Sequence, residues 1–299
     1  MSAWLVSLAG TAQGAHLATA LALMSAIAHA FFGALQKGRH DPWATRGAID
    51  LWVFALSAPV ALVLVPWPEG RQWLLLAGAL VLHFAYKLTM ALAYSRAAYT
   101  VVYPVVRGTG PLVTVAAAVL VFHEHFNPAQ WGGVALLSAA ILGLAALNLG
   151  SAPLDPRLLR AGLGWAFAAG LLVAAYTTFD AFAIRATPDP FTFLTWFFLV
   201  TAVDFPMLMA RQWARTGFVV SVPLLTRGLI GALTAFFSFG GVMLATRIGA
   251  VGQAAVLRET STLFAALIGW IMLGERTWGV KLLLMGLIAA GAVIVQTAG

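Results

Sequence analysis

Ten apolar stretches of about twenty residues cover almost the whole chain, and they constrain the fold more than any other feature. They are residues 15–36, 49–65, 73–95, 98–121, 130–149, 162–184, 191–210, 225–247, 250–273 and 278–297. A helix needs about 20 apolar residues to cross a bilayer, and the connections between these stretches are too short to hold another domain. Only 9% of the residues are charged, whereas soluble domains average about 25%. We therefore expect an all-α membrane protein with ten transmembrane helices.

An internal repeat divides these spans into two copies. Adding 151 to the residue number gives, without a gap, the matches Arg96 with Arg247, Val105 with Val256, Arg107 with Arg258, Thr109 with Thr260, Leu112 with Leu263 and Glu124 with Glu275. We predict one five-span repeat in residues 1–150 and a second in 151–299. Because five is an odd number, the second copy enters the membrane in the opposite orientation, which is the inverted-repeat plan of many secondary transporters.

The basic residues predict an orientation. Eleven of the 17 Lys and Arg residues lie beside connections that follow odd-numbered spans, three lie beside the even-numbered connections, and three lie inside spans. The net charge of +7 thus orients the chain by the positive-inside rule and does not indicate nucleic-acid binding. The rule predicts that the odd-numbered connections are cytoplasmic and that both termini are outside.

Several classes of chemistry have no support in the sequence. Cysteine is absent, which excludes thiol catalysis and cysteine-based metal sites. No nucleotide-binding or haem-binding motif and no Ser-His-Asp arrangement occurs. His123, Glu124 and His125 lack the spacing of a zinc helix. We therefore expect no cofactor and no metal, and we do not expect an ATP-driven pump.

The fourth span combines an apolar sequence with groups that lipid cannot satisfy. Pro104 and Pro111 have no N–H to bond the carbonyls four residues before them, and Arg107 lies between the two prolines. Such groups should face protein or a water-filled cavity. We expect each proline to interrupt the helical hydrogen bonding, with the freed carbonyls inside the bundle.

Polar and aromatic side chains in spans three, four, eight and nine predict a substrate pocket between these spans. An ionisable group inside a membrane costs about 2.5–3.5 kcal/mol on insertion scales and is therefore a candidate for function. The candidate substrate-binding residues are His83, Tyr86, Lys87, Tyr94, Tyr103, Arg107, Phe237, Gln253, Arg258 and Glu259. The alternative is that Lys87, Arg258 and Glu259 only join helices to one another.

Three other ionisable residues in the spans are expected to be structural. His29 in the first span is expected to be a hydrogen-bonded core histidine and not a proton relay. Asp180 and Asp204 lie about one turn from the ends of their spans. From there a carboxylate can reach interfacial water or a nearby arginine.

The repeat plan and the paired segments TVVYPVVRGTGPL and GQAAVLRETSTLF resemble the drug/metabolite transporter superfamily, specifically its EamA-type ten-span members. The resemblance covers nearly the whole chain. It implies a secondary transporter, often an exporter of amino acids or other small metabolites, with a central cavity between spans three, four, eight and nine. By position it assigns that cavity to Lys87, Tyr103, Arg107, Gln253 and Arg258. It also implies cytoplasmic termini, contrary to the charge count.

The function that we predict is gradient-coupled transport of a small anionic or zwitterionic metabolite such as an amino acid, organic acid or phosphonate. Arginine suits the acidic group of such a substrate because it binds with two parallel hydrogen bonds. We expect a multi-pass protein of a bacterial-type inner membrane, a monomer or weak dimer, whose partners are lipid and a small molecule. The alternatives are a membrane-embedded enzyme acting on a phosphate-bearing lipid or metabolite, and a non-transporting subunit.

Overall fold

The computed structural model describes residues 2–36, 41–97, 99–149, 155–216, 222–273 and 279–299. Its helices are α1 (Ser2–Ser7), α2 (Ala12–Gln36), α3 (Pro42–Pro59), α4 (Arg71–Tyr94), α5 (Tyr99–Phe122), α6 (Pro128–Leu149), α7 (Pro156–Ala186), α8 (Pro190–Thr201), α9 (Asp204–Thr216), α10 (Val222–Ala235), α11 (Gly241–Ile248), α12 (Val251–Glu259), α13 (Ser261–Leu273) and α14 (Val280–Thr297). Two π-helical turns, η1 (Val60–Leu64) and η2 (Phe236–Gly240), continue α3 and join α10 to α11. The described chain contains no strand.

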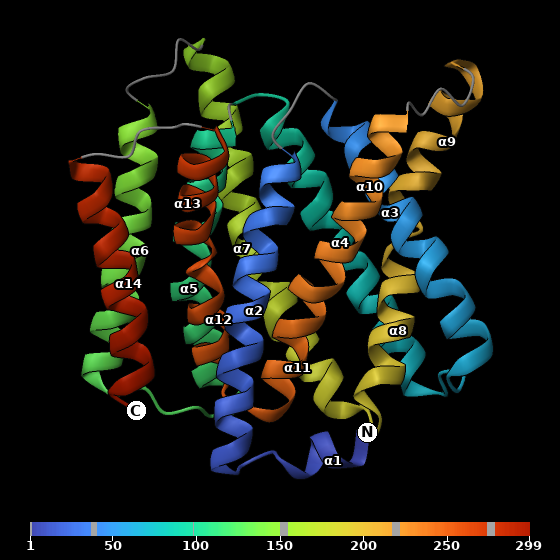
Figure 1. Ribbon diagram of the computed structural model, residues 1–299, viewed down its shortest axis with the longest axis horizontal. Coiled ribbons are helices and arrows are strands. Elements are labelled where there is room, and N and C mark those ends of the chain that lie inside the picture. The colour runs from blue at the N-terminus through green and yellow to red at the C-terminus, as the bar shows by residue number, and fades with distance from the viewer. Residues whose placement is uncertain (1, 37–40, 98, 150–154, 217–221, 274–278) are drawn as a thin grey trace.

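The helices match the ten expected spans. Within the described residues, nine helical segments are long and apolar enough to cross a membrane. The tenth expected span, residues 250–273, is formed by α12 and α13, which are separated at Thr260. Both chain ends lie at the same end of the bundle (Figure 1), as an even number of crossings requires. The chain is therefore an all-α, multi-pass membrane protein built on a ten-helix inverted repeat.

Asp-Pro pairs start three of the helices. Asp41 accepts a hydrogen bond from the amide of Ala44 at 2.9 Å before α3, and Asp189 accepts from the amide of Phe191 at 2.9 Å before α8. Asp155 does the same for α7. The carboxylate satisfies an amide that has no helical partner, and proline suits the first helical position, where no N–H is needed. These motifs fix where the spans begin.

The bundle has a central group of helices between two edges. Helices α2, α5, α7 and α12 occupy the middle, α6 and α14 pair at one edge, and α3, α8 and α9 form the other edge (Figure 1). The α6–α14 contact is close because two glycines face each other. A Cβ added to Gly291 would lie 2.6 Å from the carbonyl oxygen of Gly133. Small residues allow such close backbone approach between membrane helices.

The fourth span remains one helix through its two prolines. Helix α5 runs from Tyr99 to Phe122 without a break, with both Pro104 and Pro111 buried inside the bundle. Each proline still lacks its N–H, but neighbouring helices can support such a helix in a membrane protein. The break occurs at Thr260 in the other copy, at the position that matches Thr109. There the run Thr260-Ser261-Thr262 offers hydroxyls that compete for backbone groups, and the Thr260 hydroxyl donates to the Leu257 carbonyl at 2.6 Å.

Candidate functional site

A buried ion pair joins the two copies of the repeat at the centre of the bundle. Arg107 of α5 donates from Nη1 to Oε1 of Glu259 of α12 at 3.0 Å. The two residues are only 2% and 4% exposed. The second carboxylate oxygen of Glu259 has no hydrogen-bond partner among the described residues. The charged groups of spans four and nine thus lie together in the structure.

His29 of α2 lies against the same arginine. Its Nε2 contacts Nη2 of Arg107, and its Nδ1 lies 2.8 Å from the hydroxyl of Ser238 in η2. A guanidinium can only donate, so Nε2 accepts from Arg107, while Nδ1 lies near both the Ser238 hydroxyl and, at 3.5 Å, Nη2 of Arg258. His29 is therefore a hydrogen-bonded core histidine, as expected, but it is also a direct neighbour of Arg107.

Arg258 of α12 reaches the other ring nitrogen of His29, with its Nη2 3.5 Å from Nδ1. It is 1% exposed, its Nη1 lies 3.4 Å from the Tyr176 hydroxyl of α7, and its guanidinium lies 5.0 Å from the ring centre of Phe239. Its Nε has no partner among the described residues. A buried cation is thus supported by aromatic contacts and a weak hydrogen bond, with part of its hydrogen-bonding capacity unused.

Asp180 supplies the second carboxylate of the centre. Its Oδ2 lies 2.7 Å from Nε2 of His83 on α4, while its Oδ1 has no partner within the described chain. Asp180 and Arg258 both line a cavity of about 10 Å³, together with Tyr176 and Phe239. That volume holds about one water molecule. This cavity is thus small, and Arg107, Arg258 and Glu259 around the centre are each no more than 4% exposed.

The charges of the centre balance. With every group in its ordinary ionised form, the two positive charges of Arg107 and Arg258 are matched by the two negative charges of Glu259 and Asp180. The centre therefore has no excess of positive charge when these four groups are ionised. It provides separate positive and negative groups in a site of low dielectric, where exchange of partners has large energetic consequences.

Lys87 lies in a different cluster, on the side of α4 that faces α3 and α8. Its ammonium donates to Asp50 at 2.9 Å, to Asp204 at 2.8 Å and to the carbonyl of Thr201 at 2.5 Å. Arg46 also pairs with Asp50, at 2.8 Å. Asp204 thus has a buried lysine as its partner, where we expected interfacial water or an arginine. Lys87 is thus bonded within this cluster and not to the groups around Arg107. The structure does not bring Lys87 and Arg107 together in one pocket.

The aromatic residue that faces the centre from span eight is Phe239, not Phe237. Phe237 is 56% exposed, whereas Phe239 is 6% exposed and contacts the rings of His29 and His83. Both residues belong to the π-helical turn η2. A π-helix places more residues in each turn than an α-helix, so the register inferred from the simple offset of 151 fails here.

The remaining candidates lie near the centre with different degrees of burial. Tyr103 is buried, with its hydroxyl 3.3 Å from that of Ser261 and its ring 5.3 Å from the guanidinium of Arg107. The Tyr86 ring packs on that of Tyr176, with 5.0 Å between centres. Tyr94 and Gln253 are half-buried. Whether these residues bind substrate stays a prediction.

Sequence reasoning missed the contribution of spans one and six. His29 of α2 and Asp180 of α7 both belong to the centre, whereas only spans three, four, eight and nine were expected to line it. The sequence did not place them together, because the offset of 151 holds from Arg96 to Glu124, whereas the Asp-Pro pairs at 41 and 189 put the first spans of the two copies at an offset of 148. Asp50, the partner of Lys87, was missed because nothing in its own span indicates its partner.

Glu124 has a structural role at the end of the bundle that carries the termini. Its carboxylate accepts from the amides of Val251 at 2.5 Å and Gly252 at 2.9 Å, at the start of α12. A carboxylate satisfies free amides and favours the positive end of the helix dipole. Its expected counterpart in the repeat, Glu275, lies outside the described residues.

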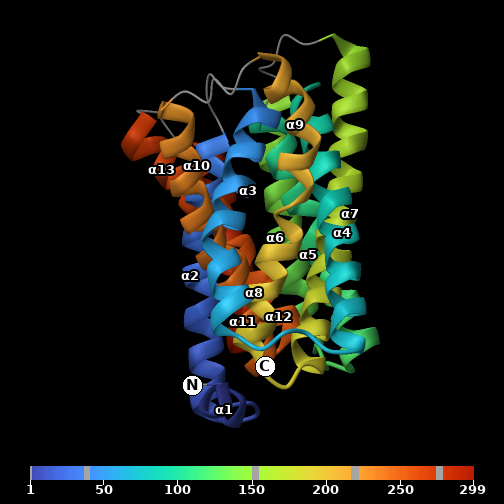
Figure 2. The same cartoon turned by 90° about the vertical axis from the view of Figure 1, so that its right-hand side faces the viewer.

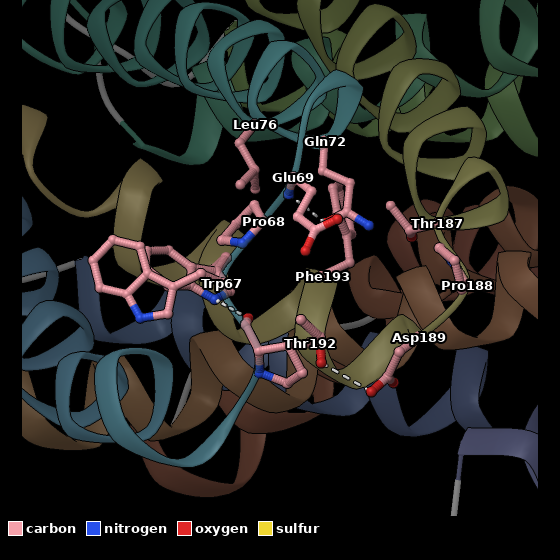
Figure 3. A pocket seen from close by; sticks show the side chains of 12 residues that line it. Trp67, Pro68, Glu69, Gln72, Leu76, Thr187, Pro188, Asp189, Thr192 and Phe193 are labelled. Carbon is pink, nitrogen blue, oxygen red and sulfur yellow. Dashed lines mark hydrogen bonds between the residues drawn. The ribbon is translucent and has the colours of Figure 1, made fainter.

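A second pocket, of about 210 Å³, opens near the same end, where the segment after η1 meets the start of α8. Figure 3 shows Trp67 and Thr192 at its sides and Glu69 pointing toward its middle. Partial burial alone would raise the pKa of Asp189 in its wall. Hydrogen bonds from Ser2, Thr192 and the Phe191 amide outweigh this effect and hold that pKa below its ordinary value. This second pocket is therefore lined by aromatic and acidic side chains, unlike the centre, where positive and negative groups are equal in number.

The comparisons with known proteins agree with this architecture. The model of the EamA-like transporter family matches residues 160–297. No curated protein matches the sequence. Among solved structures, one described only as a crystal structure of a protein has a TM-score of 0.73 and 17% identity, over 94% of this chain and 96% of that chain. At this identity the likeness shows the fold alone. Residues 160–297, in the second half of the chain, thus match the EamA-like transporter family, and the all-helical fold with nine membrane-length helical segments among the described residues is consistent with that family.

Proposed function

We propose that this protein is a secondary transporter of a small zwitterionic or anionic metabolite, and that Arg107 and Glu259 form the core of its binding site. The observation that supports the proposal most directly is the buried 3.0 Å pair between them. Burying a charged pair costs desolvation free energy that the pair regains only in part. Such a pair therefore adds little to the stability of the fold. A functional role accounts for its presence in the membrane.

The pair suits an exchange of partners. The acidic group of a substrate can replace the Glu259 carboxylate on Arg107, because both are anionic groups whose oxygens accept hydrogen bonds from a guanidinium. Glu259 is then free to bind a positive group of the same substrate. Since Glu259 and Asp180 already balance the two arginines, a zwitterion leaves the net charge of the centre unchanged, whereas a dianion does not. We therefore favour a zwitterion such as an amino acid over a strongly anionic metabolite.

The closed packing around the pair favours transport by alternating access. Arg107 and Glu259 are 2% and 4% exposed, so a substrate can reach them only after helices move apart. Arg107 and Glu259 belong to the two predicted repeats, residues 1–150 and 151–299. Movement of one repeat against the other would open the site to one side of the membrane at a time. Export from a bacterial-type cell across the inner membrane is the direction that we propose, on the basis of the family resemblance.

The proposal is tested by ligand binding to purified protein. The probes are amino acids, organic acids and phosphonates, and the readout is the shift in the unfolding temperature. For each compound that stabilises the parent protein, Arg107→Gln is expected to weaken binding by roughly 10- to 150-fold, the equivalent of one charge-assisted hydrogen bond. Arg107→Lys keeps the charge but loses the planar fork, so its loss should be smaller.

The matched control is Lys281→Gln, which removes an exposed charge from α14. Each variant is first checked for folding by circular dichroism, because loss of Arg107 leaves Glu259 buried without its partner. If folded Arg107→Gln protein binds the same compound as tightly as Lys281→Gln protein, Arg107 only joins helices and the proposed site is wrong.

A further inference from the structure

A groove on the outer surface of the bundle has the shape and charge of a lipid site. It lies between α4 and α9, has a volume of about 640 Å³, and is called the α4–α9 groove below. Its lining residues are Leu80, Val81, Phe84, Val203, Asp204, Met207, Leu208 and Arg211. Figure 2 shows α4 and α9 on the face of the bundle that is turned toward the viewer. Val81 is 65% exposed and Met207 is 72% exposed, so the groove presents apolar side chains to whatever surrounds the bundle.

One cation in this groove has no counter-ion. Arg211 is exposed, and among the described residues it takes part in no ion pair, hydrogen bond or ring contact. The carboxylate of Asp204 also lines the groove, but it is occupied by Lys87 at 2.8 Å and by the Phe205 amide at 2.6 Å. Arg211 lies seven residues after Asp204 on the same helix, which places it about 10 Å further along the axis. The groove therefore has an apolar middle and an unbalanced positive end.

We propose that the α4–α9 groove binds one anionic phospholipid, with its phosphate on Arg211 and an acyl chain along Val81, Phe84 and Leu208. Arg211 comes near the end of its span, where a long basic side chain reaches the level of the lipid headgroups. Basic pockets between membrane helices favour anionic headgroups. Zwitterionic phospholipids also carry a phosphate, but their own ammonium group competes with arginine for it. The unpaired Arg211 therefore selects a lipid with net negative charge.

The bound lipid would act on a weak point of the fold. Helix α9 follows α8 after a break at Ala202 and Val203, and it is tied to α4 by the Lys87–Asp204 pair. An acyl chain that contacts α4 and α9 together adds apolar contacts across the same junction. Removal of anionic lipid is thus expected to loosen α9 before it affects the central Arg107–Glu259 pair.

The test is native mass spectrometry of the purified full-length protein with phosphatidylglycerol or phosphatidylcholine of identical acyl chains. The parent is expected to retain one phosphatidylglycerol in preference to phosphatidylcholine. Arg211→Gln should reduce this preference by about fivefold, the contribution of one basic residue near a membrane surface. Arg215→Gln is the matched control, because Arg215 is exposed on the same helix but does not line the groove. Its effect should stay below about twofold.

A second variant tests the groove independently of charge. Val81→Trp fills the groove and should reduce retention of both lipids. Equal losses for Arg211→Gln and Arg215→Gln would show that diffuse surface charge attracts the lipid, and would overturn the proposal. Equal retention of the two lipids by the parent, or an unchanged lipid count in Val81→Trp, would overturn it as well. These readouts need no transport substrate, so their outcome does not depend on the proposed function.

Discussion

Replacement of Lys87 by methionine tests whether this residue holds the fold together. Methionine keeps most of the length of the side chain but removes the ammonium that bridges Asp50, Asp204 and the Thr201 carbonyl. Asp50 retains Arg46 as a partner at 2.8 Å. Asp204 loses its only ion pair among the described residues, and its side chain is 7% exposed. The variant thus leaves one buried carboxylate without a counter-ion.

The expected cost follows from that geometry. Removal of one partner from a buried ion pair typically destabilises a protein by about 3–5 kcal/mol. Substitution of an exposed residue usually changes stability by no more than about 0.5 kcal/mol. Lys281→Met is therefore the matched control, since Lys281 is exposed at the start of α14. The measurement is equilibrium unfolding in mixed micelles with increasing dodecyl sulfate, followed by tryptophan fluorescence.

A double variant separates lost charge balance from lost packing. Lys87→Met combined with Asp204→Asn removes both members of the pair, and it should recover at least half of the stability that Lys87→Met loses. The double variant should also bind ligand as the parent does, because Lys87 is bonded away from Arg107. The reasoning is refuted if Lys87→Met unfolds at the same dodecyl sulfate fraction as Lys281→Met. Failure of the double variant to recover would instead assign the loss to packing.

Three further predictions concern the helix contacts and caps. Gly291→Ala should destabilise the protein by about 1–3 kcal/mol, because the added Cβ would meet the Gly133 carbonyl. The control is Gly286→Ala on the same helix, whose Cβ would meet open space. In the same unfolding assay this control should be neutral or stabilising. Glu124→Gln should cost about 1 kcal/mol by weakening the cap of α12, and hydrogen exchange at the first amides of that helix should rise; unchanged exchange would argue against the cap. The depressed pKa of Asp189 means that its ionised form stabilises the fold above its ordinary pKa of about 4, and that this contribution is lost as the pH falls through the lower, folded value. Asp189→Asn should therefore flatten the acid limb of the stability–pH curve, and an unchanged limb would assign acid sensitivity to other carboxylates.

The sequence alone determined the spans and the repeat. Length and apolarity are local properties, because lipid requires about twenty apolar residues in a hydrogen-bonded helix whatever its neighbours are. Asp-Pro pairs start helices through contacts within three residues, so Asp41 and Asp189 could be recognised as boundary positions in advance. The match of Arg107 with Arg258 likewise needed only the residue numbers.

The tertiary structure decided which partner each buried charge has. Lys87 and Arg107 look alike in the sequence, as cations within apolar spans, yet one is held by Asp50 and Asp204 and the other by Glu259. Partner choice depends on how helices pack and rotate, and these are properties of residues far apart in the chain. The π-helical turn at Phe236–Gly240 rotates Phe239 inward and leaves Phe237 exposed, and the chain breaks at Thr260 and not at Pro111. The position of the break and the rotation of the turn depend on how neighbouring helices compete for the same space and the same hydrogen bonds. A local sequence pattern does not contain this information.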